Sequence, residues 1–325
     1  HGEAGGLERS AELLAEAIAD APPEPAGARA ALVTACAGLE RLLGRHGAAE
    51  ARLRGALPEA DRLDPAASAA LRVELVAGCV FQAERFDLER GRGWAEQARA
   101  EARRAGSPAL ESMTAAVMGL VECAAGATAA ARACCDDAAA ALDGLGDGDA
   151  GGAPAAAFYL GWAEYFVERF DDAARHLRHG AAAARATGQG HMIAPLLLAE
   201  AAPLLVLGRL PEVEAICEST IDAGRTSGNP QLLSWALSKR CLTRTHAGDL
   251  DGALRDGEEA LAIAARGDSQ TLAAGVGWSV GGALIEGGDP ERGRELILTS
   301  AGGPGLGIIF PCVRPLAYEL LTRAE

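Results

Sequence analysis

Aromatic side chains are scarce in this chain. They make up 4% of its 325 residues, whereas hydrophobic residues as a whole reach 49%. A core with so few rings must be built mainly from Ala, Leu and Val, whose small dispersion contacts add up only in close packing. That composition favours helices packed closely against one another.

Positive charge is also in short supply, and Lys239 is the only lysine. The 30 basic residues face 45 acidic ones, which gives a formal net charge of −15 and a pI near 4.9. A chain with this balance repels a phosphate backbone, so it is not expected to bind nucleic acid by itself.

The cysteines form no CxxC pair and show no metal-ligand spacing, and they are expected to be buried small hydrophobic residues in a reducing compartment. No stretch approaches the roughly 18 to 20 apolar residues of a membrane span, and the amino end of the given sequence lacks the apolar h-region of a signal peptide. We therefore expect a cytoplasmic protein that does not enter the membrane. The eight cysteines are Cys36, Cys79, Cys123, Cys134, Cys135, Cys217, Cys241 and Cys312.

Catalytic signatures occur only out of context. Residues 277–281 (GWSVG) fit the nucleophile-elbow pattern G-x-S-x-G, but they lie within a helical repeat and not in a strand-turn-helix unit. Residues 146–151 (GDGDAG) fit G-x-G-x-x-G without a preceding strand, and no Walker A loop exists. His176 and His179 could touch one metal ion, yet nothing completes the site, so a solvated helix face is expected. We expect no catalytic residues, no metal and no cofactor in this chain.

What the chain does contain is a repeated turn. Seven positions recur at intervals of 40 or 42 residues, and each is followed by a short turn and a second helical stretch. Such a period indicates a solenoid built from helical hairpins. The seven positions are Gly44, Glu84, Gly126, Glu168, Gly208, Gly248 and Gly288.

Small residues accompany the turns at fixed offsets. Seven residues before each turn stands Ala, Gly or Cys, and five residues after it stands Ala, Val or Gly, except at Glu89, where the second repeat is expected to slip. These columns resemble the tetratricopeptide pattern with longer helices. The predicted fold is therefore all-α, a tetratricopeptide-like solenoid of about seven helix-turn-helix repeats with a period of 40–42 residues.

Residues 1–325 are expected to form one superhelical domain, cut from a longer polypeptide because the chain begins with His1 and stops inside a helical run. The Gly- and Asp-rich stretch 143–152 is expected to be a flexible loop. The segment 302–315 is expected to be irregular and to pack back on the last helices.

The first helix of each hairpin should line the concave face of such an array. The expected offsets bring unusual residues there, including three of the four tryptophans. Clusters of rings commonly anchor ligands or partner chains, although rings can equally fill gaps in an Ala-rich core. The candidate binding residues are Phe158, Trp162, Tyr165, Phe166, Trp235, His246 and Trp278.

Five short sequence phrases from residue 155 onward are distinctive. They are 160–165 (LGWAEY), 185–191 (RATGQGH), 227–231 (SGNPQ), 301–304 (AGGP) and 314–321 (RPLAYELL). With these phrases, the second half of the chain resembles the helical-repeat region of large ATP-binding LuxR-type (LAL) transcriptional regulators. The first half matches them only in repeat spacing and composition.

In that family an amino-terminal ATP-binding module precedes the superhelix, and a carboxy-terminal helix-turn-helix module binds DNA. The resemblance implies a sensor that binds a small effector and controls transcription, with possible self-association. ATP and DNA binding would belong to the two flanking modules, which this chain lacks. The alternative is a protein-interaction scaffold without a small ligand.

Overall fold

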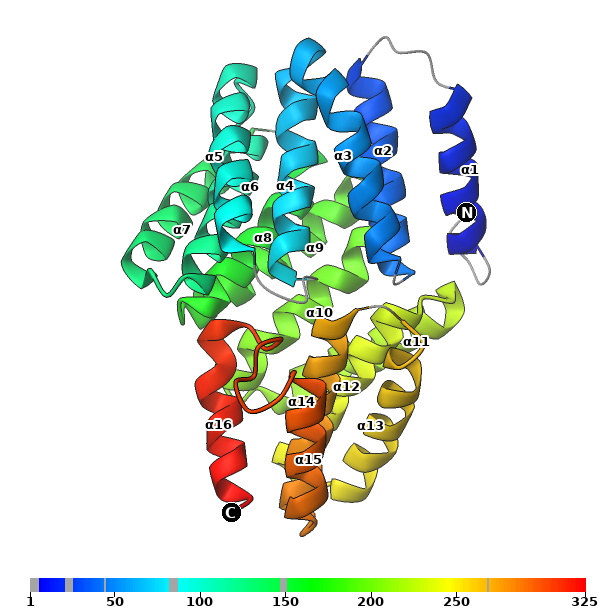
Figure 1. Ribbon diagram of the computed structural model, residues 1–325, viewed down its shortest axis with the longest axis vertical. Helices are drawn as coiled ribbons and strands as arrows, with labels where there is room; N and C mark the ends of the chain where they lie inside the picture. The colour runs from blue at the N-terminus through cyan, green and yellow to red at the C-terminus, as the bar shows by residue number, and fades with distance from the viewer. Residues whose placement is uncertain (1–5, 21–25, 44, 82–86, 147–150, 268) are drawn as a thin grey trace.

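A computed structural model describes residues 6–20, 26–43, 45–81, 87–146, 151–267 and 269–325. These residues form α-helices with short 3-10 segments, and no β-strand occurs among them (Figure 1). The all-α prediction is confirmed. The helices are α1 (Gly6–Asp20), α2 (Ala26–Leu42), α3 (His46–Leu63), α4 (Pro65–Phe81), α5 (Leu88–Ala105), α6 (Pro108–Ala124), α7 (Thr128–Asp143), α8 (Ala153–Phe166), α9 (Phe170–Ala186), α10 (Gly190–Val206), α11 (Leu210–Ser227), α12 (Pro230–Ala247), α13 (Leu250–Ala264), α14 (Gln270–Glu286), α15 (Pro290–Ser300), η2 (Pro311–Val313) and α16 (Arg314–Arg323).

The predicted turns lie where the backbone becomes left-handed. Five of the seven marked positions have positive φ, a conformation that glycine adopts without a steric cost and that closes a helix at its carboxyl end. Their φ values are 77° at Gly126, 64° at Glu168, 72° at Gly208, 85° at Gly248 and 89° at Gly288. The other two marks, Gly44 and Glu84, lie outside the described residues.

Capping side chains restart the helix after several of these turns. Asp87, Asp249 and Asp289 each accept a hydrogen bond from the backbone N–H three residues later, in the N-terminal turns of α5, α13 and α15. Such a cap satisfies one of the free N–H groups at a helix start. In the last two hairpins, a left-handed glycine is therefore followed directly by an acidic cap, Asp249 or Asp289.

The small residues before the turns are there because the paired helices touch. A Cβ atom added at Gly161 would lie 2.3 Å from Leu177 Cγ, and one added at Gly281 would lie 2.4 Å from Ile297 Cγ1. The slip in the second repeat is also confirmed. Glu89 is exposed, whereas the buried position is Gly91, whose added Cβ would lie 3.7 Å from Cys79 Cβ.

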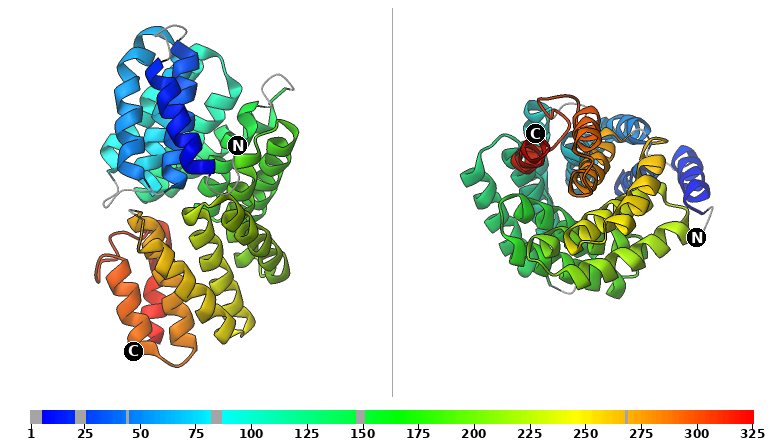
Figure 2. Two further views of the ribbon diagram at one scale, coloured as in Figure 1. Left: turned by 90° about the vertical axis from the view of Figure 1, so that its right-hand side faces the viewer. Right: turned by 90° about the horizontal axis from the view of Figure 1, so that it is seen from below.

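Seven hairpins follow one another from α2/α3 to α14/α15, and the two helices of each pair pack together. The first helices also pack on one another in series, α2 on α4 and so on to α12 on α14, so they form the inner layer. Seen from below in Figure 2, the helices wind around a central axis. The winding brings α12 into contact with α2.

The carboxyl-terminal segment connects distant parts of this winding. Leu306 and Ile309 are buried in a cluster that includes Ala274 and Ile297 of the last hairpin. Phe310 belongs instead to the cluster of α4, α6 and α8. The packing on the last helices is as expected, but the contact with α8 was not foreseen, and α16 begins at Arg314, inside the range expected to be irregular.

In the stretch 143–152, which was expected to be flexible, α7 ends at Asp143 and α8 begins at Ala153, while residues 147–150 lie outside the described part of the chain.

Across the described ranges, no helix combines the length and the apolar character that crossing a membrane requires.

Candidate ligand-binding site

Four of the predicted site residues lie on α8, one of the inner helices. Their spacing repeats the 3.6-residue period, so Phe158, Trp162 and Phe166 follow one face of the helix. The indole ring of Trp162 stacks on Phe166 with ring centroids 5.7 Å apart and meets Tyr165 edge-on, also at 5.7 Å. The side chains of all four residues are partly buried.

Trp235 of α12 completes this group. Its ring centroid lies 5.9 Å from that of Trp162, and the interplanar angle is 27°. The two tryptophans are 73 positions apart in sequence numbering and belong to non-adjacent inner helices, so the winding of the array is what brings them together. Five predicted residues therefore share one place in the fold.

Two predicted residues lie elsewhere. Trp278 packs against the cluster of Leu306 and Ile309 at the carboxyl-terminal end, and its Nε1 is buried without a hydrogen-bond partner among the described residues. His246 is exposed near the end of α12. Trp278 and His246 are not among the rings that stack with Trp162, so the seven residues do not form one continuous site.

Sequence reasoning missed two rings that belong to the group. Phe81, at the end of α4, lies 6.2 Å from Trp162, and Phe310 stacks on Phe166 with centroids 4.2 Å apart. Phe81 stands three residues before the Glu84 mark, so its position in the inner helix of the slipped repeat could have indicated it. Nothing in the repeat pattern indicates Phe310. We call Phe81, Phe158, Trp162, Tyr165, Phe166, Trp235 and Phe310 the inner aromatic cluster.

Charged groups of the inner helices pair with one another near this cluster. Glu74 of α4 forms an ion pair with Arg41 of α2 and accepts a hydrogen bond of 2.7 Å from the hydroxyl of Tyr159 on α8. Burial lowers the pKa of Arg41 and raises that of Tyr159. These contacts hold three inner helices together and leave little free charge there.

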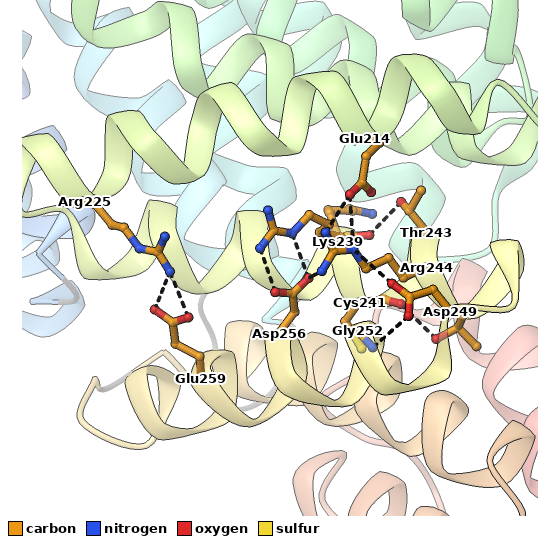
Figure 3. Close-up of polar contacts among 12 residues, drawn as sticks. Glu214, Arg225, Lys239, Cys241, Thr243, Arg244, Asp249, Gly252, Asp256 and Glu259 are labelled. Carbon is orange, nitrogen blue, oxygen red and sulfur yellow. Dashed lines mark hydrogen bonds and ion pairs between the residues drawn. The ribbon is translucent and has the colours of Figure 1, made fainter.

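The ion pairs continue along α12. Arg240 binds both carboxylate oxygens of Asp256 at 2.7 Å, and Arg244 contacts Glu214 at 2.9 Å and Asp256 at 3.0 Å (Figure 3). Such bidentate pairs fix the inner helix α12 to the outer helices α11 and α13. Lys239 directly precedes Arg240 in sequence, but no ion pair involves its side chain in the described residues.

The expectation of a solvated face for the two histidines is wrong for His176 and right for His179. His176 is 1% exposed, and its Nδ1 lies 2.7 Å from Glu164 Oε2 of α8. Burial raises the pKa of Glu164. The pair joins α8 to α9. Among the described residues, no group of three or more His, Cys, Asp or Glu side chains could hold a metal ion.

A hollow of about 390 Å³ lies apart from the inner aromatic cluster, where the ends of α11 to α14 meet Leu43 beyond α2. Its wall contains none of the predicted site residues. It includes Arg225, which is paired with Glu259 at 3.0 Å, and the half-exposed Gln231. The hollow reflects the meeting of the two ends of one superhelical turn.

Architecture and periodicity together define the chain as a tetratricopeptide-like α-solenoid. Its fold resembles a Rap protein crystallised with competence and sporulation factor, with a TM-score of 0.61, 13% identity, and coverage of 91% of this chain and 89% of that one. It also resembles the apo form of RapI, with a TM-score of 0.52, 10% identity, and coverage of 98% and 85%. No family model and no curated protein matches the sequence. At these identities the likeness concerns the fold alone.

Proposed function

We propose that the chain is a regulatory helical-repeat domain that binds a small effector on the inner face of its superhelix. The observation that carries this proposal is the stack of Trp162 on Trp235, which joins two non-adjacent inner helices. An effector that inserts beside these rings would change how α8 and α12 sit relative to each other. In a solenoid such a local change alters the curvature of the whole array.

The wider setting follows from the resemblance to LuxR-type ATP-binding regulators. In this proposal the effector-bound superhelix acts on an ATP-binding module and a helix-turn-helix module of the same cytoplasmic protein, and DNA is bound only through the latter. The similar fold of a Rap protein that was crystallised with competence and sporulation factor supports a binding role for the superhelix. It does not indicate which molecule this chain binds.

A thermal-shift screen with sugars, acyl-CoA thioesters and secondary metabolites tests the proposal. A ligand that binds only the folded state raises the free energy of unfolding by RT ln(1 + [L]/Kd). A compound at about 100 times its Kd therefore adds about 2.7 kcal/mol to that free energy. We expect saturable stabilisation of the wild type that Trp235→Ala removes.

The matched control is Trp94→Ala. Trp94 lies on α5, where Arg54 and Arg90 approach its ring at 5.3 Å and 5.7 Å, and it is not part of the inner aromatic cluster. This variant should keep the ligand-induced shift. Equal shifts in the wild type and in Trp235→Ala would contradict the proposal, and silence across the panel together with capture of a partner segment would favour the protein-interaction scaffold.

A further inference from the structure

The one lysine of the chain occupies an unusual place. Lys239 follows Trp235 by four residues on α12, so the two side chains are neighbours on one face of that helix. Lys239 is partly exposed, and it lies on the inner layer through which Trp235 reaches Trp162. The one lysine of the chain therefore stands one helical turn along α12 from the tryptophan stack.

This ammonium group has no partner within the described ranges. Its neighbours Arg240 and Arg244 engage Asp256 and Glu214, whereas the one contact shown for Lys239 in Figure 3 is made by its backbone carbonyl, which accepts from Thr243 at 2.8 Å. Cations in crowded protein surroundings are normally paired or hydrogen-bonded. Lys239 is partly exposed and makes no such contact among the described residues, whereas the arginines beside it do.

No nearby group supplies a compensating negative charge at neutral pH. Cys217 is the side chain whose charge would act on Lys239, but burial raises the pKa of that thiol to about 12, so it stays neutral. Glu214 is held by Arg244. Burial lowers the pKa of Lys239 to about 8, which leaves most of the population protonated near pH 7. The site is a partly exposed cation that lacks a protein anion in the described part of the chain.

We propose that Lys239 anchors the anionic group of the effector, and that the effector is an aromatic carboxylate whose flat body packs beside Trp235 and Trp162. This inference rests on the proposed function and names the class of its ligand. A carboxylate would pair with the ammonium group and the ring would extend the existing stack. The chain has a net charge of −15, so its surface as a whole repels anions. The ammonium group of Lys239 would attract an anion locally.

Calorimetric titration of the full chain with 2-naphthoate and 2-naphthamide tests this, because the two probes share a ring system and differ in charge. We expect 2-naphthoate to bind the wild type about tenfold tighter than 2-naphthamide, a difference of about 1.4 kcal/mol. Lys239→Met should abolish this preference and leave 2-naphthamide binding unchanged, while Lys239→Arg should keep it. Absence of 2-naphthoate binding to the wild type at about 1 mM, or an unchanged preference in Lys239→Met, would overturn the proposal.

A second measurement needs no substitution. Reductive methylation with ¹³C-formaldehyde labels only two amines, Lys239 and the chain's α-amine, because no other lysine is present. Saturating 2-naphthoate should shift the Lys239 methyl signal, and 2-naphthamide should shift it far less. An unmoved signal at concentrations where calorimetry detects binding would overturn the assignment of Lys239.

The two proposals can fail separately. If Trp235→Ala abolishes probe binding and Lys239→Met has no effect on the preference for the anion, the inner face binds ligands but Lys239 is not the anchor. If Trp235→Ala binds both probes as the wild type does, the inner-face function itself is wrong.

Discussion

Lys239 carries a charge that the fold leaves unpaired, and this should show in the stability of the protein. Burial lowers the pKa of Lys239 from 10.5 to about 8. Between these two values the unfolded chain holds a proton that the folded chain has lost, so the stability of the wild type rises with pH across that window. Well below pH 8 both states are protonated, and the full cost of partly burying the ammonium group remains.

Lys239→Met should therefore be more stable than the wild type at about pH 7, by roughly 1 to 3 kcal/mol, and the advantage should shrink towards about pH 10. Urea unfolding of both proteins at several pH values measures this, because other titrating groups cancel in the difference. A difference that does not change with pH would contradict the lowered pKa.

Glu168 has a backbone conformation that is unfavourable for a residue with a side chain. It has φ of 64° at a turn where Gly126, Gly208, Gly248 and Gly288 fill the equivalent positions. A left-handed conformation costs an L-residue roughly 1 to 2 kcal/mol relative to glycine. We expect Glu168→Gly to raise the free energy of unfolding by about 1 kcal/mol.

The control for this prediction is the reverse exchange at an equivalent turn. Gly208 has φ of 72° and no atom within 4 Å of an added Cβ, so Gly208→Ala should lose stability through backbone strain alone. Urea unfolding of both variants measures the two changes. If both variants moved in the same direction, the repeat equivalence of the turns would be wrong.

At the scale of the helical hairpin, the close approach of paired helices depends on missing side chains. An added Cβ at Gly161 would meet Leu177, a fully buried side chain of α9, at 2.3 Å. Inserting a methyl group into such packing costs about 1 to 3 kcal/mol. We expect Gly161→Ala to lower the midpoint of thermal unfolding by an amount that corresponds to this loss.

Gly275→Ala is the matched variant within another inner helix. An added Cβ at Gly275 has no neighbour within 4 Å, so alanine there should gain roughly 0.5 to 1 kcal/mol from its higher helix propensity. Calorimetric melting of both variants distinguishes packing from propensity. Equal effects of the two substitutions would show that the α8/α9 contact tolerates a larger side chain.

The hairpins are also where the sequence was most informative. A turn glycine such as Gly208 reports a local backbone requirement, and a small residue such as Gly161 or Gly281 reports a local contact, so both can be recognised within one repeat. The pairing of His176 with Glu164 could not be recognised, because a histidine on a polar-looking helix gives no sign of the acid that covers it. The choice between a solvated and a buried face depends on the neighbouring helix.

Across the whole molecule, the inner aromatic cluster was only partly predictable for the same reason. Offsets from the turns placed Trp162 and Trp235 on inner helices, but their stacking depends on how far the superhelix winds between α8 and α12. The repeat offsets also placed Trp278 on an inner helix, but its side chain packs with the carboxyl-terminal segment. Phe310 reaches Phe166 from an irregular segment that has no repeat register.

That last contact makes the array more than a chain of nearest neighbours. Phe310 stacks on Phe166 at 4.2 Å, and two residues later the thiol of Cys312 lies 3.3 Å from the carbonyl of Cys123 on α6, 189 positions away in the chain. In a simple solenoid, a change near the last repeat affects only its neighbours. Here the end of the chain is packed against its middle, so the two regions should open together.

Phe310→Ala should therefore increase hydrogen exchange in α6 and α8 as well as in α14 to α16, with a loss of about 3 to 5 kcal/mol in global stability. Exchange measured by mass spectrometry, peptide by peptide, tests this. Leu316→Ala is the control, because Leu316 lies on α16 and is 47% exposed, so its removal should leave α6 and α8 unchanged. If Phe310→Ala raised exchange only in the last two hairpins, the carboxyl-terminal segment would not couple the end of the superhelix to its middle, and an effector bound beside Trp162 would have no route through Phe310 to the carboxyl end.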